Sequence, residues 1–368
     1  MTPPETQVAV LTPAGRGAVA TVAVRGPRAL AVVHPYFLAA SQRHLTEVPA
    51  GRIQFGRFRS TSGSQEEIVA VVIGPEEIEL HCHGGPAAAD AIVQTLVAAG
   101  AVPIPWQQWV ADGEDPIQAE CRLALAAATT ERTCAILLDQ YRGALAAELA
   151  RIDELLNRAD AGQQREAQDR LGRLLTLART VGAHLTTPWR IVIAGEPNVG
   201  KSSLINALLG YERSIVFDQP GTTRDALSAL TGIDGWPIEL TDTAGLRAAA
   251  DSLEAAGIER TQEQLVSADG VVLVTDVTAE CRAAVPSGAI LVGNKADLID
   301  TEKRRTWQER HPGGLLTSAR VGEGIDELCR QIGRRLVPLA PLAGEAVPFT
   351  PRQIALVQRR IAAGGSSG

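Results

Sequence analysis

Residues 195–202, with the sequence Gly-Glu-Pro-Asn-Val-Gly-Lys-Ser, have the residue types and spacing of a phosphate-binding loop. The loop follows the apolar run 190–194 and leads into residues 203–209, where the pattern predicts a helix, so the required strand–loop–helix context is present. Backbone N–H groups and the helix N-terminus would surround the phosphates. Lys201 is predicted to reach the β- and γ-phosphates and Ser202 to bind Mg²⁺. The predicted nucleotide-binding residues of this loop are Asn198, Val199, Gly200, Lys201, Ser202 and Ser203.

A second motif, residues 294–297, predicts which base is bound. Asn294, Lys295 and Asp297 follow the apolar run 288–293. A carboxylate at Asp297 can accept hydrogen bonds from N1–H and the exocyclic amino group of guanine, a donor pair that adenine lacks. Further along, Ser318 and Ala319 stand where small GTPases of the translation-factor-like class carry the loop that closes over guanine, and this resemblance implies GTP rather than ATP.

Between these motifs lie two segments that resemble the switch loops of GTPases. Residues 221–225 contain Thr222 and Thr223, and Thr223 is expected to complete the Mg²⁺ coordination and to sense the γ-phosphate. Residues 242–245 follow a predicted strand at 237–241. Their expected roles are a water-mediated Mg²⁺ contact for Asp242 and a γ-phosphate contact for the Gly245 N–H, and the remaining nucleotide-binding residues are Thr243 and Ala244. The next residue is Leu246, where many GTPases place a glutamine that orients water, so another group must position the nucleophile.

The composition is that of a globular protein, with 45% hydrophobic and 21% charged residues in a chain of 368. The net charge of −7 gives no overall footprint for nucleic acid. No apolar run approaches 18 residues and the N-terminus lacks a basic segment, so we expect neither a membrane span nor a secretory signal. The five scattered cysteines form no Cys-x-x-Cys motif, which favours reduced thiols and a cytoplasmic location.

Periodicity divides the chain into four parts and predicts an α/β multidomain fold. Residues 1–114 alternate like strands and contain one alanine-rich helix, residues 115–187 show helical spacing throughout, and residues 188–337 carry the nucleotide motifs. This third part is expected to be a Ras-like P-loop GTPase domain with a doubly wound, mostly parallel sheet. Residues 338–368 are predicted to be a linker rich in proline and glycine that ends in one short helix.

When the order of the domains and the motifs are considered together, most of the chain resembles the MnmE (TrmE) family of tRNA-modification GTPases. The resemblance rests on the nucleotide motifs and on the N-terminal half, in residues 8–19, in residues 79–86 (Glu-Leu-His-Cys-His-Gly-Gly-Pro) and in residues 118–120. It implies an N-terminal domain of folate-binding type that dimerises. It also implies hydrolysis when two GTPase domains meet across a potassium ion held by Asn198, with Glu254 orienting the water. The implied catalytic residues are Glu254, Lys201, Thr223 and Gly245.

The same resemblance implies partners, and it also contains departures. The family modifies the wobble uridine of tRNA with a flavoprotein partner, MnmG, and binds GTP and GDP as a homodimer. Here the family's Cys-Ile-Gly-Lys motif is missing before Gly368. Of the folate-pocket residues only Glu79 matches, whereas Ala23 and Gly113 stand where the family has arginine and lysine, which makes folate doubtful.

These departures leave alternatives open. The chain can be a divergent paralogue that serves as a GTP-dependent regulatory or assembly switch, or its record can be shortened. With half of a helical bundle absent, the apolar positions between Leu145 and Leu175 are expected to be partly uncovered and buried by self-association or a partner. His81 and His83 share one face of a predicted strand and Cys82 the other, so a metal site there is disfavoured against a role in shaping the N-terminal pocket.

Overall fold

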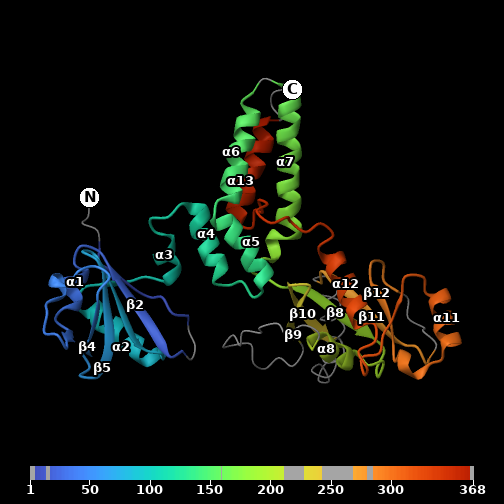
Figure 1. The fold of residues 1–368 in the computed structure, drawn as a ribbon, viewed down its shortest axis with the longest axis horizontal. Helices are drawn as coiled ribbons and strands as arrows, with labels where there is room; N and C mark the ends of the chain where they lie inside the picture. Colours follow the sequence, from blue (N-terminus) through green and yellow to red (C-terminus); the bar gives the residue numbers. More distant parts are fainter. Residues whose placement is uncertain are drawn as a thin grey trace, which may run out of the picture. The chain divides into compact units, whose positions relative to one another are not determined.

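The computed structural model describes residues 5–13, 17–158, 160–210, 228–242, 268–279 and 285–364 (Figure 1). Residues up to Glu114 form one compact unit, and the described residues from Asp115 onwards form a second. The expected fold class is confirmed, because an N-terminal α/β unit is followed by helices and then by a second, mostly parallel sheet. No helix among the described ranges has the length and apolar character needed to cross a bilayer.

The N-terminal unit is built on a seven-stranded sheet with the order β3-β4-β5-β6-β2-β1-β7. Neighbouring strands are antiparallel, except that β1 pairs with β7 in parallel. The elements are β1 (Gln7–Val10), β2 (Val19–Arg25), α1 (Ala29–Val33), β3 (Phe37–Ala39), a 3₁₀ turn (Leu45–Glu47), β4 (Ile53–Arg59), β5 (Gln65–Gly74), β6 (Glu77–His83), α2 (Pro86–Ala98), β7 (Val102–Pro103) and α3 (Trp106–Ala111).

One face of this sheet forms the core of the unit, and the other face is largely open. On the core face, buried side chains of β2, β5 and β6 pack with those of α1 and α2. Cys82 belongs to that core, whereas His81 lies on the opposite face, as strand alternation predicts. Among the described residues no three or more His, Cys, Asp or Glu side chains gather as a metal site. The open face carries the exposed side chains Val19, Leu38, Ile53, Phe55 and Ile73.

The second unit begins with a helical bundle that a C-terminal helix completes. Its helices are α4 (Pro116–Leu125), α5 (Glu131–Tyr141), α6 (Ala144–Leu156), α7 (Ala161–Thr180) and α13 (Pro351–Gly364), with a 3₁₀ turn at Gly182–His184. Figure 1 shows α13 lying alongside α6 and α7. Leu145, Leu149, Ile152, Leu171 and Leu174 are buried in one cluster with Val357 of α13.

The expectation of a partly uncovered apolar stripe was therefore wrong for these positions. The apolar residues of α6 and α7 form their core with α13, which is 14 residues long and extends beyond the short helix predicted at 353–361. Burial within the chain lowers the free energy of the folded state without any partner. The sequence pattern predicted the apolar stripe of α6 and α7. It did not predict that α13 covers this stripe, because α13 is far from both helices along the chain.

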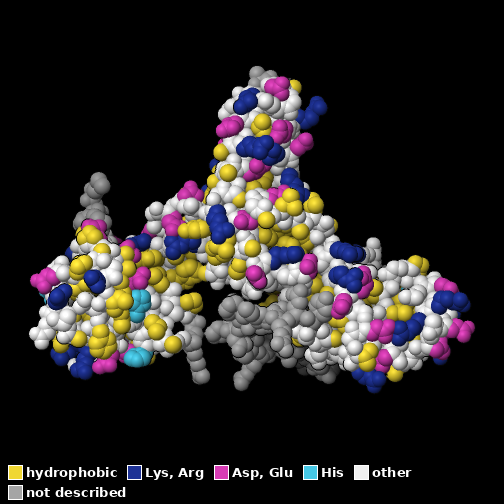
Figure 2. Space-filling view, in the orientation of Figure 1, with side chains coloured by type: hydrophobic (Ala, Val, Ile, Leu, Met, Phe, Trp, Pro, Cys, Tyr) yellow, Lys and Arg dark blue, Asp and Glu magenta, His cyan; other side chains and the backbone are white. Residues whose placement is uncertain are grey.

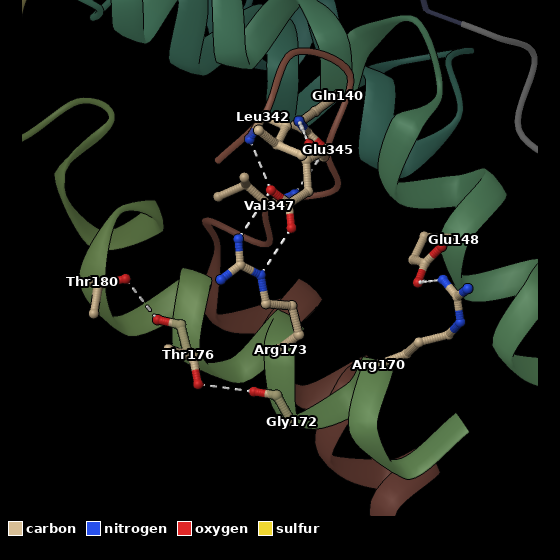
Figure 3. A network of polar contacts seen from close by, with 10 residues as sticks. All are labelled: Gln140, Glu148, Arg170, Gly172, Arg173, Thr176, Thr180, Leu342, Glu345 and Val347. Carbon is tan, nitrogen blue, oxygen red and sulfur yellow. Dashed lines mark hydrogen bonds and ion pairs between the residues drawn. The ribbon is translucent and has the colours of Figure 1, made fainter. Parts of the chain in front are cut away.

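The segment before α13, predicted as a linker, is anchored by a polar network (Figure 3). Arg173 of α7 donates two hydrogen bonds to the Glu345 carboxylate, at 2.9 and 3.1 Å. Gln140 of α5 is fully buried, and its side chain binds the Glu345 carbonyl and the Val347 N–H. These bonds satisfy a buried amide and fix the segment against two helices, so it is not a free tether.

The GTPase region contains a six-stranded sheet with the order β13-β12-β11-β8-β10-β9, parallel except for β9. Helices lie on both faces, because α8 and α12 share one cluster with the sheet while Trp307 of α11 packs on Leu273 and Leu291 from the other side. The elements are β8 (Trp189–Gly195), α8 (Lys201–Leu209), β9 (Ser228–Ile233), β10 (Trp236–Asp242), β11 (Gly270–Asp276), β12 (Ile290–Asn294), a 3₁₀ turn (Ala296–Leu298), α11 (Thr301–Arg310), β13 (Leu315–Leu316) and α12 (Ile325–Leu336).

Aromatic side chains join the bundle to this sheet. Trp189 of β8 meets Trp236 of β10 edge to face, with ring centroids 5.4 Å apart, and stacks on His184 at 4.3 Å. Arg132 of α5 lies over the Trp236 ring and donates a hydrogen bond of 3.1 Å to Asp234. The cluster that buries both tryptophans also contains Leu137 and Leu177 of the bundle, so helices and sheet share one core.

Candidate nucleotide-binding site

The phosphate-binding loop lies between β8 and α8, as the motif predicts. Asn198 has φ of +63° and Gly200 has φ of +94°, so the loop turns through left-handed conformations before the helix begins. Glycine adopts this region without strain, and asparagine is among the few other residues that tolerate it. The chain thereby brings the backbone N–H groups of the first turn of α8 to the carboxyl edge of the sheet.

Gly200 is required for a second reason, which is its contact with the base-recognition motif. A Cβ at this position would lie 2.3 Å from Nδ2 of Asn294. The Asn294 amide is 2% exposed and donates a 3.0 Å hydrogen bond to the Val199 carbonyl, and its Oδ1 accepts from the Ala319 N–H at 3.1 Å. One side chain thus connects the phosphate loop to the loop expected to cover the base.

Lys201 and Ser202 stand at the start of α8, at the centre of the predicted phosphate site. Lys201 is 5% exposed, and its ammonium donates to the carbonyls of Gly195 and Glu196 at 3.1 and 2.8 Å. Ser202 Oγ donates to a carboxylate oxygen of Asp242, at 3.0 Å. A hydroxyl and a carboxylate in contact beside a phosphate loop are the hard oxygen ligands that suit Mg²⁺, so these residues fit that ion.

Lys295 links the base motif to the phosphate loop. It adopts φ of +68°, and its ammonium contacts the Asn198 carbonyl at 2.8 Å and the Asp276 carboxylate at 2.6 Å. Burial alone would raise the pKa of Asp276, but the hydrogen bonds from Lys295 and Thr278 outweigh it, and the net shift of the pKa is downward. Asp276 therefore remains ionised and holds the Lys295 stem along one wall of the site.

The Asp297 carboxylate is held at the far end of the same site. Ser318 Oγ donates to its Oδ1 at 2.6 Å, and Arg320 approaches its Oδ2 at 3.2 Å. The hydrogen bond from Ser318 is the main reason that the pKa of Asp297 lies below its ordinary value, and the charge of Arg320 acts in the same direction. An ionised carboxylate offers only acceptors, which matches the two N–H donors of guanine.

One cavity of about 620 Å³ lies beside these residues and is lined by some of them, and its size suits a small-molecule ligand. Its wall contains the predicted residues of the two base-recognition loops, together with Gly200 and Ser203 of the phosphate loop. The lining residues are Gly200, Ser203, Asn206, Ala207, Asn294, Lys295, Asp297, Leu298, Ser318, Ala319 and Arg320.

Some of the predicted residues are not in this cavity or cannot be placed. Thr222, Thr223, Thr243, Ala244, Gly245 and Glu254 lie outside the described residues, as does Leu246. The structure describes Asn198, Val199, Lys201, Ser202 and Asp242, but they are not among the residues that line the cavity. Glu79 belongs to the N-terminal unit. Sequence reasoning missed the lining residues Asn206, Ala207, Leu298 and Arg320, and also Asp276, which contacts Lys295. Arg320 directly follows Ser318 and Ala319, so its place in the sequence was a usable signal, whereas Asp276 is brought to Lys295 only by the pairing of β11 with β12.

Comparison with known proteins finds a matching family for the N-terminal region and another for the GTPase region. Residues 190–303 match the family described as 50S ribosome-binding GTPase, and residues 6–107 match that described as GTP-binding protein TrmE N-terminus. The tRNA modification GTPase MnmE of Moorella thermoacetica is 31% identical over 94% of this chain and 85% of its own length. That of Symbiobacterium thermophilum is 33% identical over 96% and 87%, and that of Bacillus subtilis 31% identical over 88% and 81%.

These matches run through both units, and the motifs that carry them stand in the geometry described above. The chain therefore belongs to the MnmE family of tRNA modification GTPases and is a GTP-binding and GTP-hydrolysing protein of that type.

Proposed function

We propose that GTP binds in the 620 Å³ cavity with its guanine on Asp297 and its phosphates at the start of α8. The observation that carries this proposal is the Asp297 carboxylate, kept ionised by Ser318 at the rim of that cavity. Asn294 and Lys295 orient the two loops, and Ala319 closes over the base. A site of this kind rejects adenine, because its acceptors would be left unpaired against the wrong edge.

Within this site we assign the phosphate chemistry to residues at the start of α8 and at the end of β10, together with Thr223 and Gly245. Lys201 supplies positive charge to the β- and γ-phosphates, and Ser202, Thr223 and Asp242 hold Mg²⁺, with Asp242 acting through water. The Ser202–Asp242 contact supports this assignment. The bound Mg²⁺ would draw charge from the phosphate oxygens, and Gly245 and Thr223 would sense the γ-phosphate.

For the hydrolysis step we propose that Glu254 orients the attacking water, because Leu246 has no hydrogen-bonding group. We further propose that Asn198 helps to hold K⁺ when two GTPase domains meet. Asn198 is exposed on the phosphate loop, and its side-chain oxygen is a hard ligand suited to an alkali cation. Positive charge at that point would stabilise the charge that develops between the β- and γ-phosphates.

The test is GTP hydrolysis by the full chain in potassium and in sodium buffers at equal ionic strength, with Asn198→Ala and Glu254→Ala alongside. We expect stimulation by potassium in the wild type, loss of that stimulation in Asn198→Ala, and slow turnover in Glu254→Ala in both salts. Equal turnover in both salts, unaffected by either substitution, would contradict the potassium mechanism while leaving GTP binding intact.

At the level of the cell we propose a cytoplasmic homodimer that takes part in wobble-uridine modification of tRNA with an MnmG-like flavoprotein. The open face of the N-terminal sheet supports dimerisation, since it carries exposed apolar side chains, and hydrophobic side chains are visible on the surface of this unit in Figure 2. Analytical ultracentrifugation tests the dimer, with Phe55→Glu as the variant expected to shift it to monomer.

A second candidate function is a GTP-dependent regulatory or assembly switch without one-carbon chemistry of its own. It is favoured by the contrast between the complete nucleotide-binding motifs of the sequence and the uncharged Ala23 and Gly113 in the N-terminal unit. Mass spectrometry of tRNA from a strain that lacks the chain separates the two. Loss of the wobble modification supports the tRNA role, and an unchanged modification profile supports the switch.

A further inference from the structure

The open face of the N-terminal sheet contains the position at which members of this family would be expected to hold a folate. Ala23 of β2 lies directly opposite Glu79 of β6 in the antiparallel register. Ala23 is fully buried, so a methyl group occupies the place where a neighbouring cation would stand beside the Glu79 carboxylate. Gly113, the second position at which the resemblance implies a cation, has φ of +86° and no neighbour within 4 Å of a Cβ built there.

Arg25, a cation on this face, already contacts other residues of the chain. It is two residues beyond Ala23 and therefore on the same side of β2. Its Nε donates to the Gln7 side chain at 2.9 Å, its Nη1 donates to the Trp109 carbonyl at 3.1 Å, and its Nη2 pairs with the Asp112 carboxylate. The guanidinium also lies over the Trp109 ring, 4.4 Å from its centroid.

These contacts give Arg25 a structural task. None of the residues of α3 is buried, so little apolar burial holds this short helix to the sheet. Arg25 contacts both Trp109 within α3 and Asp112 just after it. It stacks on the Trp109 ring and donates charge-assisted hydrogen bonds, which are stronger than hydrogen bonds between neutral groups. Releasing Arg25 to a ligand would free the end of α3.

Glu79 is likewise engaged within the chain. Its carboxylate lies 3.4 Å from His81 Nε2, and His81 Nδ1 is 3.0 Å from the Thr21 hydroxyl. Glu79, His81 and Thr21 thus form a line of polar contacts across β6 and β2. A folate brings a polar pterin ring and a tail with two carboxylates, and burying these groups without cations or donors is unfavourable.

We propose that the open face of the N-terminal sheet does not bind a folate and that Arg25 instead clamps α3 to the sheet. This inference concerns a surface outside the nucleotide cavity, and it does not depend on whether GTP binds there.

The first test is equilibrium dialysis of the full chain against 5-formyltetrahydrofolate, up to about 1 mM, the weakest affinity of interest. The wild type is compared with Glu79→Gln and with a matched control, Glu67→Gln, an exposed carboxylate on β5. We expect the three proteins to bind the same amount of folate. This holds whether none binds or all three bind it at some other surface. Saturable binding by the wild type and the control that is lost in Glu79→Gln would overturn the proposal.

The second test measures the clamp by amide hydrogen exchange without any ligand. Arg25→Gln is expected to speed exchange over residues 107–112 by about tenfold, because the stacking and ion-pair contacts that hold α3 are removed. Exchange over α2 should not change, and Arg59→Gln, an exposed arginine on β4, is the matched control. Unchanged protection of α3 in Arg25→Gln would overturn the clamp.

Discussion

Asn294 and Gly200 link the base-recognition motif to the phosphate loop, because the Asn294 amide occupies the space that a side chain at position 200 would need. The amide bonds the Val199 carbonyl on one side and the Ala319 N–H on the other. The left-handed turn of the phosphate loop and the position of the guanine loop are therefore determined together.

The first prediction concerns this contact. Gly200→Ala should weaken GDP binding at least about tenfold, because a left-handed alanine costs about 1–3 kcal/mol and its Cβ displaces Asn294. Fluorescence titration with a labelled GDP measures the change. Gly210→Ala, at the other end of α8 with a right-handed backbone, is the matched control and should bind normally. Wild-type affinity in Gly200→Ala would show that Asn294 does not couple the loops.

The second prediction concerns the join between bundle and GTPase sheet. Arg132→Met should lower the free energy of unfolding by about 1–2 kcal/mol, because it removes a stacked cation over Trp236 and the ion pair with Asp234. Urea unfolding followed by tryptophan fluorescence measures it. Arg142→Met, an exposed arginine at the end of the same helix, should change stability little. Equal effects of both substitutions would argue against the contact.

The third prediction follows from the pair of Glu345 and Arg173. The hydrogen bonds from Arg173 hold the pKa of Glu345 below its ordinary value of 4.5. A carboxyl whose pKa is lowered by folding contributes stability above its unfolded pKa and loses it as the pH falls through the folded pKa. The wild type should therefore lose more stability than Glu345→Gln between neutral pH and the region below 4.5.

At neutral pH, Glu345→Gln should itself cost about 1–2 kcal/mol, the range for a partly exposed charge-assisted hydrogen bond. Thermal unfolding of both proteins across that pH range provides the measurement. Parallel curves for wild type and variant would mean that the pair does not anchor the segment before α13.

The sequence motifs included most of the residues that line the candidate cavity, and the reason is local. Residues 195–202 and 294–297 are short motifs that each follow one strand, so their chemistry can be inferred before the strands are paired. Asp276 was missed because its contact with Lys295 depends on the register between β11 and β12. α13 was predicted too short and its role was missed, because the pattern of residues 351–364 does not identify the distant helices that it covers.

The N-terminal unit shows the same limit. The alternation of β2 and β6 predicted which side chains share a face, but not that Arg25 would reach Trp109 and Asp112 at the far end of the unit. The structure places these residues together because α3 returns to the sheet after β7. Contacts of this kind depend on the path of the whole chain rather than on any single motif.

The most direct test of the nucleotide site exchanges its base specificity through Asp297. Replacing guanine by xanthine puts an oxygen where guanine has its amino group, so Asp297→Asn should favour xanthosine nucleotides through its amide donor. We predict that the wild type binds and hydrolyses GTP but not XTP, and that Asp297→Asn reverses the preference for both binding and hydrolysis. An unchanged preference for GTP in Asp297→Asn would contradict the assignment of this cavity as the site of GTP hydrolysis.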